Sequence, residues 1–168
     1  MILSFYGNGK GKTCAALGLS LRASGYGNKI LFTQFVKGDW QTGEDMALAK
    51  IKNLKHKKFG AGFILPTDTK TKRLQHLSAC RKGVNYVKNH AKEYNLVVMD
   101  EIFVAIKYKL TDPQAILNIL KTNPEVDFIL TGRPAIKELV NKSDIASEIR
   151  KIKHSFDRGK KAKKGIDY

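Results

Sequence analysis

Cysteine, proline, acidic residues and long apolar runs are all scarce in this sequence. The two cysteines, Cys14 and Cys80, lack the spacing of a metal site or a redox pair, which argues against a disulfide framework. No apolar run approaches the ~20 residues that cross a bilayer, and the first residues lack the pattern of a signal peptide. We therefore expect a cytoplasmic protein that does not bind membranes.

Acidic residues number 15 against 31 lysines and arginines, which gives a formal net charge of +16 at pH 7. Such a charge favours anionic partners, namely a nucleotide, a nucleic acid, a phosphorylated ligand or an acidic protein, without selecting one of them. With four prolines and 42% hydrophobic residues, the 168 residues are long enough to bury a core. We expect one domain over residues 1–168.

The most informative stretch is FYGNGKGKT, residues 5–13. A short apolar run at 2–6 predicts a buried strand before it. Apolar residues at 15–21 predict a helix after it, which Gly25 and Gly27 would end. Strand, glycine-rich turn, Gly-Lys-Thr and helix is the order of a phosphate-binding P-loop, although a glycine-rich turn without a ligand remains an alternative.

In a P-loop, glycines allow successive backbone amides to face an anion at the start of a helix. Lys12 would reach the terminal phosphates, and the Thr13 hydroxyl would hold Mg²⁺. Only three residues separate Gly7 from Gly11, one fewer than usual, which indicates a particular P-loop family. Cys14, in the first helical turn, is better explained by packing than by chemistry. The predicted nucleotide-binding residues here are Gly7, Asn8, Gly9, Lys10, Gly11, Lys12, Thr13 and Cys14.

Strand and helix patterns alternate along the rest of the chain. Further strands are predicted at 29–36, 96–99, 126–130 and near 149–152, and a short strand is predicted to start at Lys58-Phe59. Helices are predicted at 74–91, at 112–123 and at about 135–141, and Thr67 or Asp68 would cap the first of them. The lysine-rich residues 52–58 are interpreted as a solvated face. Apolar strands alternating with helices predict an α/β fold, with a mostly parallel sheet and helices on both faces.

Ligands of parallel sheets gather at the carboxyl ends of the strands. An apolar strand followed by Asp100-Glu101 matches a Walker B pattern. In this pattern Asp100 would hold Mg²⁺ and Glu101 would orient water or substrate. The alternative is an aspartate that caps a helix, followed by a solvated glutamate. Arg133 would bind phosphate or pair with an acid. Candidate ligand-binding residues of the loop after the second strand are Lys37, Trp40 and Glu44. His56, His76 and His90 show no ligand spacing, and no role is assigned to them.

An ordered set of motifs resembles the P-loop corrinoid adenosyltransferases over nearly the whole chain. The motifs are GNGKGKT, QFVKGDW with Gly43-Glu44, Asp100-Glu101, Thr131-Gly132-Arg133, and HSFD with GIDY at the C-terminus. The resemblance implies a P-loop NTPase (RecA-like) fold, a homodimer, and ATP, Mg²⁺ and a corrinoid as ligands. It further implies that Co(I) attacks C5′ of ATP, which lies reversed in the P-loop relative to kinases, and that triphosphate leaves. Lys12, Asp100 and Glu101 would then be the catalytic residues.

Two departures from the family pattern stand out. Longer relatives carry an N-terminal helix over the active site, whereas this sequence begins at the first strand. Relatives also carry Gly-Phe-x-Trp in the corrin-contacting loop; here Phe63 is retained and Leu65 replaces the tryptophan. The tail lysines at 160, 161, 163 and 164 are interpreted as a solvated surface or as a docking site for an acidic flavoprotein reductant, and the final residues are expected to dock.

Two other functions fit parts of the sequence. A small kinase or ATPase would transfer the γ-phosphoryl group and release ADP. A RecA-like nucleic-acid-binding module would explain the positive charge, but the sequence lacks aromatic residues interleaved with basic ones for stacking bases. We therefore expect small-molecule substrates and no nucleic acid.

Overall fold

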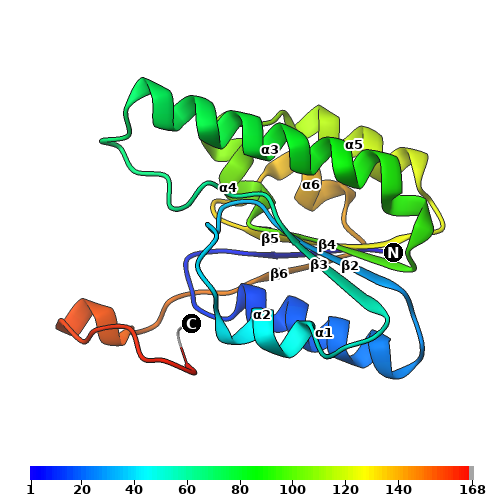
Figure 1. The fold of residues 1–168 in the computed structure, drawn as a ribbon, viewed down its shortest axis with the longest axis horizontal. Helices are drawn as coiled ribbons and strands as arrows, with labels where there is room; N and C mark the ends of the chain where they lie inside the picture. Colours follow the sequence, from blue (N-terminus) through cyan, green and yellow to red (C-terminus); the bar gives the residue numbers. More distant parts are fainter. Residues whose placement is uncertain (167–168) are drawn as a thin grey trace.

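The computed structural model describes residues 1–166; Asp167, Tyr168 and the side chain of Phe156 lie outside the description, and with them the expected docking of the last residues. A central sheet lies between two layers of helices (Figure 1). The strands are β1 (Ile2–Tyr6), β2 (Ile30–Gln34), β3 (Leu54–Lys58), β4 (Leu96–Asp100), β5 (Asp127–Gly132) and β6 (Ile145–Glu148). The helices are α1 (Lys12–Gly25), α2 (Gly43–Leu48), α3 (Lys70–His90), α4 (Ile102–Lys107), α5 (Pro113–Thr122) and α6 (Lys137–Lys142), with short 3₁₀ turns at Ala91–Glu93 and Ser155–Arg158.

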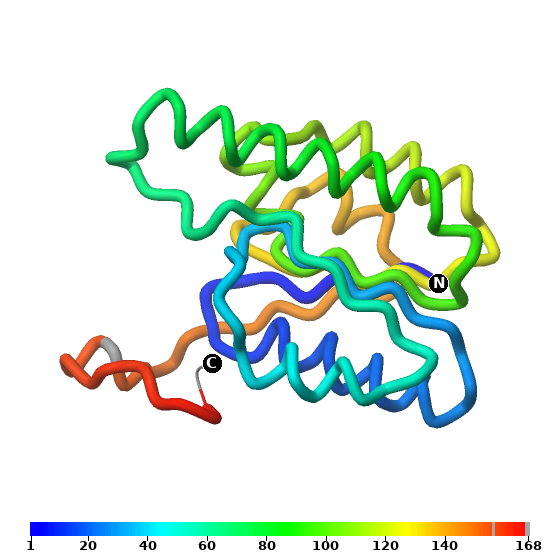
Figure 2. Tube along the Cα trace, in the orientation of Figure 1, coloured from blue at the N-terminus to red at the C-terminus, as the bar shows by residue number. Residues whose placement is uncertain are grey.

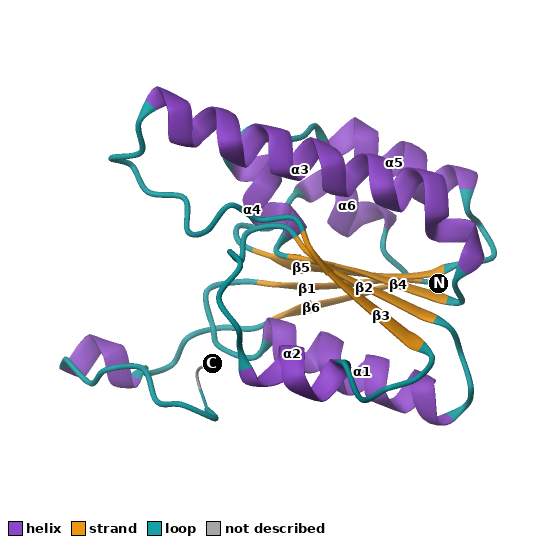
Figure 3. Ribbon diagram, viewed as in Figure 1, coloured by secondary structure: helices purple, strands orange, loops and turns teal. Residues whose placement is uncertain are grey.

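The sheet has the order β3-β2-β4-β5-β1-β6, and every strand pair is parallel. Helices α1 and α2 cover one face, and α3 to α6 cover the other (Figures 1 and 3). The predicted α/β P-loop fold, with helices on both faces of the sheet, is confirmed. One strand, β5, separates the P-loop strand β1 from the Asp100 strand β4, so the two motifs meet across it.

Successive residues of the inner strands pack alternately into two separate hydrophobic cores, one on each face of the sheet. Leu31, Val97 and Phe128 pack toward the α3 side, while Phe32 and Val98 pack toward α1. Apolar side chains on both faces of a strand require helices on both sides of the sheet. The packing of helices on both faces stabilises the sheet, and the carboxyl ends of β1, β2, β4 and β5 therefore lie together at one edge.

The two edge strands differ from the prediction. β3 occupies Leu54–Lys58, inside the segment interpreted as a solvated face, and ends where a strand was expected to start. Its lysines suit an edge strand, which must avoid pairing with other chains, and the Lys57 ammonium lies 4.9 Å from the centroid of the Tyr86 ring. β6 ends at Glu148, before the predicted 149–152, because its pairing with β1 sets its register and leaves Ile152 91% exposed.

The helices also depart from the prediction in detail. α2 and α4, of six residues each, were not predicted because so short a segment gives little periodicity. Thr69, rather than Thr67 or Asp68, caps α3, and its hydroxyl accepts a hydrogen bond from the Lys72 amide. Leu74 belongs to the apolar residues at spacings of three and four that predict a buried face for this helix, yet it is 57% exposed.

Candidate active site

The P-loop connects β1 to α1 with two glycines in left-handed backbone conformations, Gly7 at φ 106° and Gly11 at φ 119°. A side chain would be strained at either position. Lys12 begins the helix and is buried, and its ammonium donates a hydrogen bond to the Gly9 carbonyl at 2.8 Å. Burial lowers the pKa of Lys12, opposed by the charge of Glu101. The lysine is therefore held inside the loop, where the charge of an anionic ligand would offset the free-energy cost of burying the ammonium.

Asp100 ends β4 and is fully buried. Its Oδ1 accepts hydrogen bonds from the Thr13 hydroxyl at 2.9 Å and from the Thr131 hydroxyl at 2.7 Å. Its Oδ2 accepts one from the Gln34 amide at 3.1 Å. The carboxyl ends of β2, β4 and β5 and the first turn of α1 thus converge on one carboxylate, as the paired motifs predict.

Glu101 follows in a left-handed conformation, φ 60°, which is unusual for a residue with a side chain. Its amide donates to the Thr131 hydroxyl at 2.9 Å. Its buried Oε2 has no hydrogen-bond partner within residues 1–166. Burial, with the neighbouring Asp100 charge, raises the pKa of Glu101. A strained, incompletely bonded carboxylate at this place is typical of a functional group rather than a structural one.

These elements surround a cavity of about 770 Å³, a size that suits a nucleotide-sized ligand. Lys37 and Glu44 pair across its rim, and the Lys37 ammonium holds the pKa of Glu44 below its usual value against the opposing effect of burial. The predicted residues that line it are Asn8, Gly9, Lys10, Gly11, Lys12, Thr13, Cys14, Lys37, Glu44, Glu101 and Arg133. The predicted residues Gly7, Trp40, Phe63, Leu65 and Asp100 are not part of the lining.

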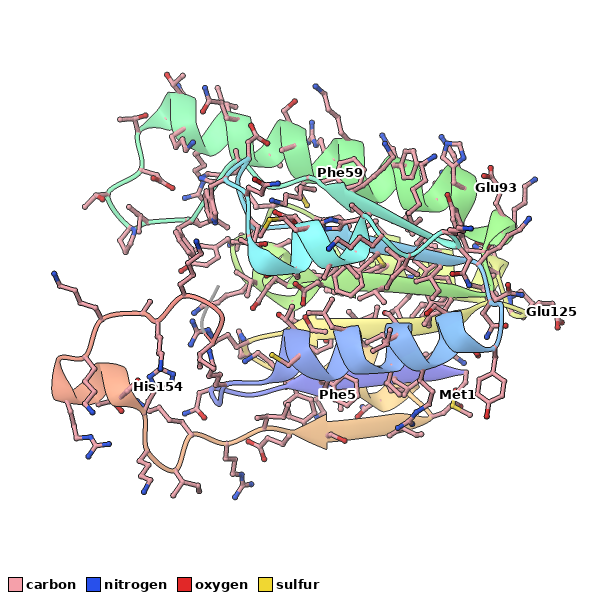
Figure 4. The ribbon with its side chains drawn as sticks, turned by 60° about the horizontal axis from the view of Figure 1, so that its bottom comes forward. Met1, Phe5, Phe59, Glu93, Glu125 and His154 are labelled. Atoms are coloured by element: carbon pink, nitrogen blue, oxygen red, sulfur yellow. The ribbon has the colours of Figure 1, made fainter. Side chains whose placement is uncertain are left out.

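The C-terminal segment supplies a wall of the cavity; the sequence predicted that the end of the chain docks, but not where. Ile149 accepts a hydrogen bond from the Gly9 amide at 2.8 Å, and the Lys151 amide donates to Asn8 Oδ1 at 2.9 Å. Further lining residues are Leu17, Gly43, Lys151, His154, Asp157, Gly165 and Ile166. The segment runs beside the P-loop end of the sheet (Figure 2), and His154 lies at the opposite end of the molecule from Glu93 and Glu125 (Figure 4). The HSFD motif was the available signal for this contact.

Trp40, Phe63 and Leu65 are exposed apolar side chains outside the lining of the cavity. Trp40 is 43% exposed, Phe63 is 69% exposed and Leu65 is 54% exposed. The Trp40 and Phe63 ring centroids lie 5.2 Å apart. The loop after β2 and the loop before α3 therefore meet through these two rings, outside the lining of the phosphate cavity, a contact that the sequence did not predict.

Two features are absent from the described residues. In the part of the chain that the structure describes, no three His, Cys, Asp or Glu side chains come together as a metal site. Over the same residues, no helix is long and apolar enough to cross a membrane.

Comparison with known proteins identifies the family. A model of the family described as ATP:corrinoid adenosyltransferase BtuR/CobO/CobP matches residues 1–168. The corrinoid adenosyltransferase of Escherichia coli K12 is 34% identical, and CobA of Salmonella typhimurium LT2 is 33% identical, each over 100% of this chain and 85% of the relative. The replication initiator DnaA bound to AMPPCP and single-stranded DNA aligns at 17% identity and a TM-score of 0.47, over 88% of this chain and 40% of that one, which is too low to carry an argument. The chain therefore belongs to the ATP:corrinoid adenosyltransferase family and is an enzyme of the transferase class.

Proposed function

We propose that the chain transfers the 5′-deoxyadenosyl group of ATP to the cobalt of a reduced corrinoid. The electron pair of Co(I) forms the Co–C5′ bond, the C5′–O5′ bond breaks, and its electron pair leaves on inorganic triphosphate. Cobalt is formally oxidised from Co(I) to Co(III). No proton has to be removed from the nucleophile, so the reaction requires no general base.

The observation that carries this proposal is the concentration of positive charge around a nucleotide-sized cavity. Lys12, Lys37 and Arg133 line it together with the P-loop amides. In this reaction the leaving group carries the whole triphosphate charge, so groups fixed around the phosphates stabilise the transition state more than the ground state. A γ-phosphoryl transfer would instead require an acceptor beside the γ-phosphate.

Magnesium fits the residues at the base of the cavity. The Thr13 hydroxyl and the Asp100 carboxylate are the oxygen donors that Mg²⁺ prefers, and the magnesium sites of nucleotide enzymes commonly use one or two protein ligands plus phosphate oxygens. Glu101 lines the cavity with a buried oxygen that lacks a partner among the described residues, and it would accept a hydrogen bond from water or substrate. Bound there, Mg²⁺ would supply charge stabilisation for the departing triphosphate.

The exposed Trp40–Phe63 pair supports a corrinoid-binding role for this surface. A corrin ring is large and apolar on its faces, and neighbouring aromatic side chains that stay exposed to solvent mark ligand-binding surfaces. We propose that Phe63 and Leu65 approach the lower face of the corrin. There they would occupy the space of the lower axial ligand and make Co(II) easier to reduce.

Partner, assembly and location are proposals of the same kind. The tail lysines are exposed and suit docking of an acidic, flavodoxin-like protein that delivers the electron for Co(I). Replacing the lysines at 160, 161, 163 and 164 with serine should slow an assay coupled to such a reductase and leave an assay with chemical reductant unchanged. Family resemblance further favours a homodimer, which light scattering of the purified chain would test. It also favours a cytoplasmic location.

Product stoichiometry tests the proposed reaction. The purified chain is incubated with ATP, Mg²⁺ and chemically reduced cobalamin, and corrinoid and phosphate products are quantified together. Adenosylcobalamin and inorganic triphosphate should form in equal amounts. ADP or orthophosphate as the stoichiometric product would identify a kinase or ATPase, and salt-sensitive DNA binding without corrinoid turnover would identify a nucleic-acid-binding module.

A further inference from the structure

A chain of buried polar contacts extends from Asp100 away from the nucleotide cavity. The Gln34 side-chain amide donates to Asp100 Oδ2 at 3.1 Å, and Gln34 Oε1 lies 3.0 Å from His56 Nε2. Gln34 is 1% exposed. Both contacts join neighbouring strands, since β2 lies between β4 and β3 at this end of the sheet.

The carboxylate fixes the direction of every hydrogen bond in this chain. Asp100 accepts only, so the Gln34 amide nitrogen must point to it and Gln34 Oε1 must face His56. His56 Nε2 therefore carries the hydrogen and donates. Phe32 packs edge-on against the imidazole, with ring centroids 5.9 Å apart, and holds the ring in place. Without the His56 donor, the Gln34 amide would lose the contact that sets its orientation.

Beyond His56 the contacts continue to the loop that bears the aromatic surface. His56 Nδ1 lies 3.5 Å from Asp45 Oδ1, and Asp45 forms an ion pair with Lys58. The Lys58 ammonium donates to the Trp40 carbonyl at 2.8 Å. The approach of His56 to Asp45 is a close contact without a hydrogen bond, because Asp45 Oδ1 has no hydrogen-bond partner within residues 1–166. The contact of Lys58 with the Trp40 carbonyl is exposed. Together these contacts link the carboxylate at the base of the P-loop with the backbone of the Trp40 loop.

We propose that Gln34 and His56 are positioning residues that hold the Asp100 carboxylate toward Thr13, and that Asp45 and Lys58 tie the Trp40 loop to the same network. The first part rests on the magnesium site given under the proposed function. Outer-shell partners of this kind change metal affinity by about 10–100-fold when removed. Neither Gln34 nor His56 lines the cavity, so nucleotide binding without Mg²⁺ should not depend on them.

The test measures ATP binding calorimetrically across a series of Mg²⁺ concentrations and again in EDTA. His56→Leu should raise the half-saturating Mg²⁺ concentration about 10-fold or more and leave ATP affinity in EDTA unchanged. His56→Gln, whose amide nitrogen is as many bonds from the backbone as Nε2, should restore the wild-type value to within about threefold. His90→Leu is the matched control, because His90 stacks on Tyr86 at the far end of α3.

Tryptophan fluorescence supplies an independent measurement, since Trp40 is the only tryptophan in the chain. Mg²⁺ added to the ATP complex should change its emission in the wild type, and Lys58→Met should diminish that change. Thermal melts establish that each variant is folded. A normal Mg²⁺ dependence in folded His56→Leu, or failure of His56→Gln to restore it, would overturn the positioning role, and an unaltered emission change in Lys58→Met would overturn the tie to the Trp40 loop.

Asp100→Asn separates this inference from the proposed function. A shifted Mg²⁺ dependence in Asp100→Asn with none in His56→Leu would leave the metal assignment standing and refute the positioning role. No shift in Asp100→Asn would refute the metal assignment, and the positioning role with it.

Discussion

Replacing Glu101 with glutamine should stabilise the ligand-free protein at neutral pH. Glu101 is partly buried beside Asp100, and its buried Oε2 has no hydrogen-bond partner within residues 1–166. Leaving such a group unsatisfied costs about 1–3 kcal/mol, and more when it is charged. Glutamine has nearly the same volume and the same strained backbone conformation at φ 60°. The substitution therefore isolates the cost of the charge.

The gain should depend on pH. The pKa of Glu101 is raised above 4.5 in the folded state, so the folded protein retains this proton more strongly than the unfolded chain does. Below pH 4.5 the residue is neutral in both states, and the variant and the wild type should be equally stable. As the pH rises from 4.5 through the folded pKa, the wild type loses stability relative to the variant.

Thermal unfolding in EDTA without nucleotide measures this difference. A domain of 150–250 residues gains about 2–4 °C in Tm per kcal/mol, so about 1–3 kcal/mol corresponds to about 2–12 °C at pH 7. Glu125→Gln, at an exposed position on the opposite side of the molecule from His154 (Figure 4), should change Tm little at any pH. A lower Tm for Glu101→Gln at pH 7, or an equal gain at pH 4 and pH 7, would refute the reasoning.

The other predictions concern turnover. Glu101→Gln should be slower than the wild type despite its greater stability, and an unchanged rate would remove Glu101 from the catalytic residues. Lys12→Ala should lose ~10²–10³ in rate with preformed Co(I), the usual cost of one preorganised charge contact, and wild-type turnover would exclude it from the site. Phe63→Ala should impair reduction of Co(II) and spare the reaction with preformed Co(I); equal loss in both assays would contradict this role. Leu65→Trp should add about 1–2 kcal/mol of apolar contact, roughly 40–90 mV for one electron, and raise the yield of four-coordinate Co(II) in EPR spectra; unchanged spectra would argue against it.

Local patterns were sufficient where the structure depends on neighbours in the sequence. The glycines and Gly-Lys-Thr predicted the P-loop, and the apolar run before Asp100 predicted the strand that ends there. The contact between Thr13 and Asp100 followed from the general rule that parallel strands share a carboxyl edge. The P-loop and the strand before Asp100 require no knowledge of strand order, whereas the distance between the two motifs depends on β5 being the one strand between them.

Features that depend on strand order could not be predicted. His56 has no ligand spacing in the sequence, and its contact with Gln34 exists only because β3 lies beside β2. The position of β6 is set by its pairing with β1, which no apolar pattern in an exposed edge strand encodes. The contribution of Lys151 to the cavity wall could not be predicted either, because its amide donates a hydrogen bond to Asn8 only when β6 is paired with β1.

The central claim is that C5′ of ATP, rather than a phosphorus atom, is the centre attacked. ATP carrying ¹⁸O in the bridge between C5′ and the α-phosphorus tests it directly in a single turnover with chemically reduced cobalamin. Cleavage of the C5′–O5′ bond predicts that all of the label leaves in inorganic triphosphate and that the corrinoid gains an unlabelled adenosyl group. Label retained on a nucleoside phosphate, with no Co–C bond formed, would contradict the account.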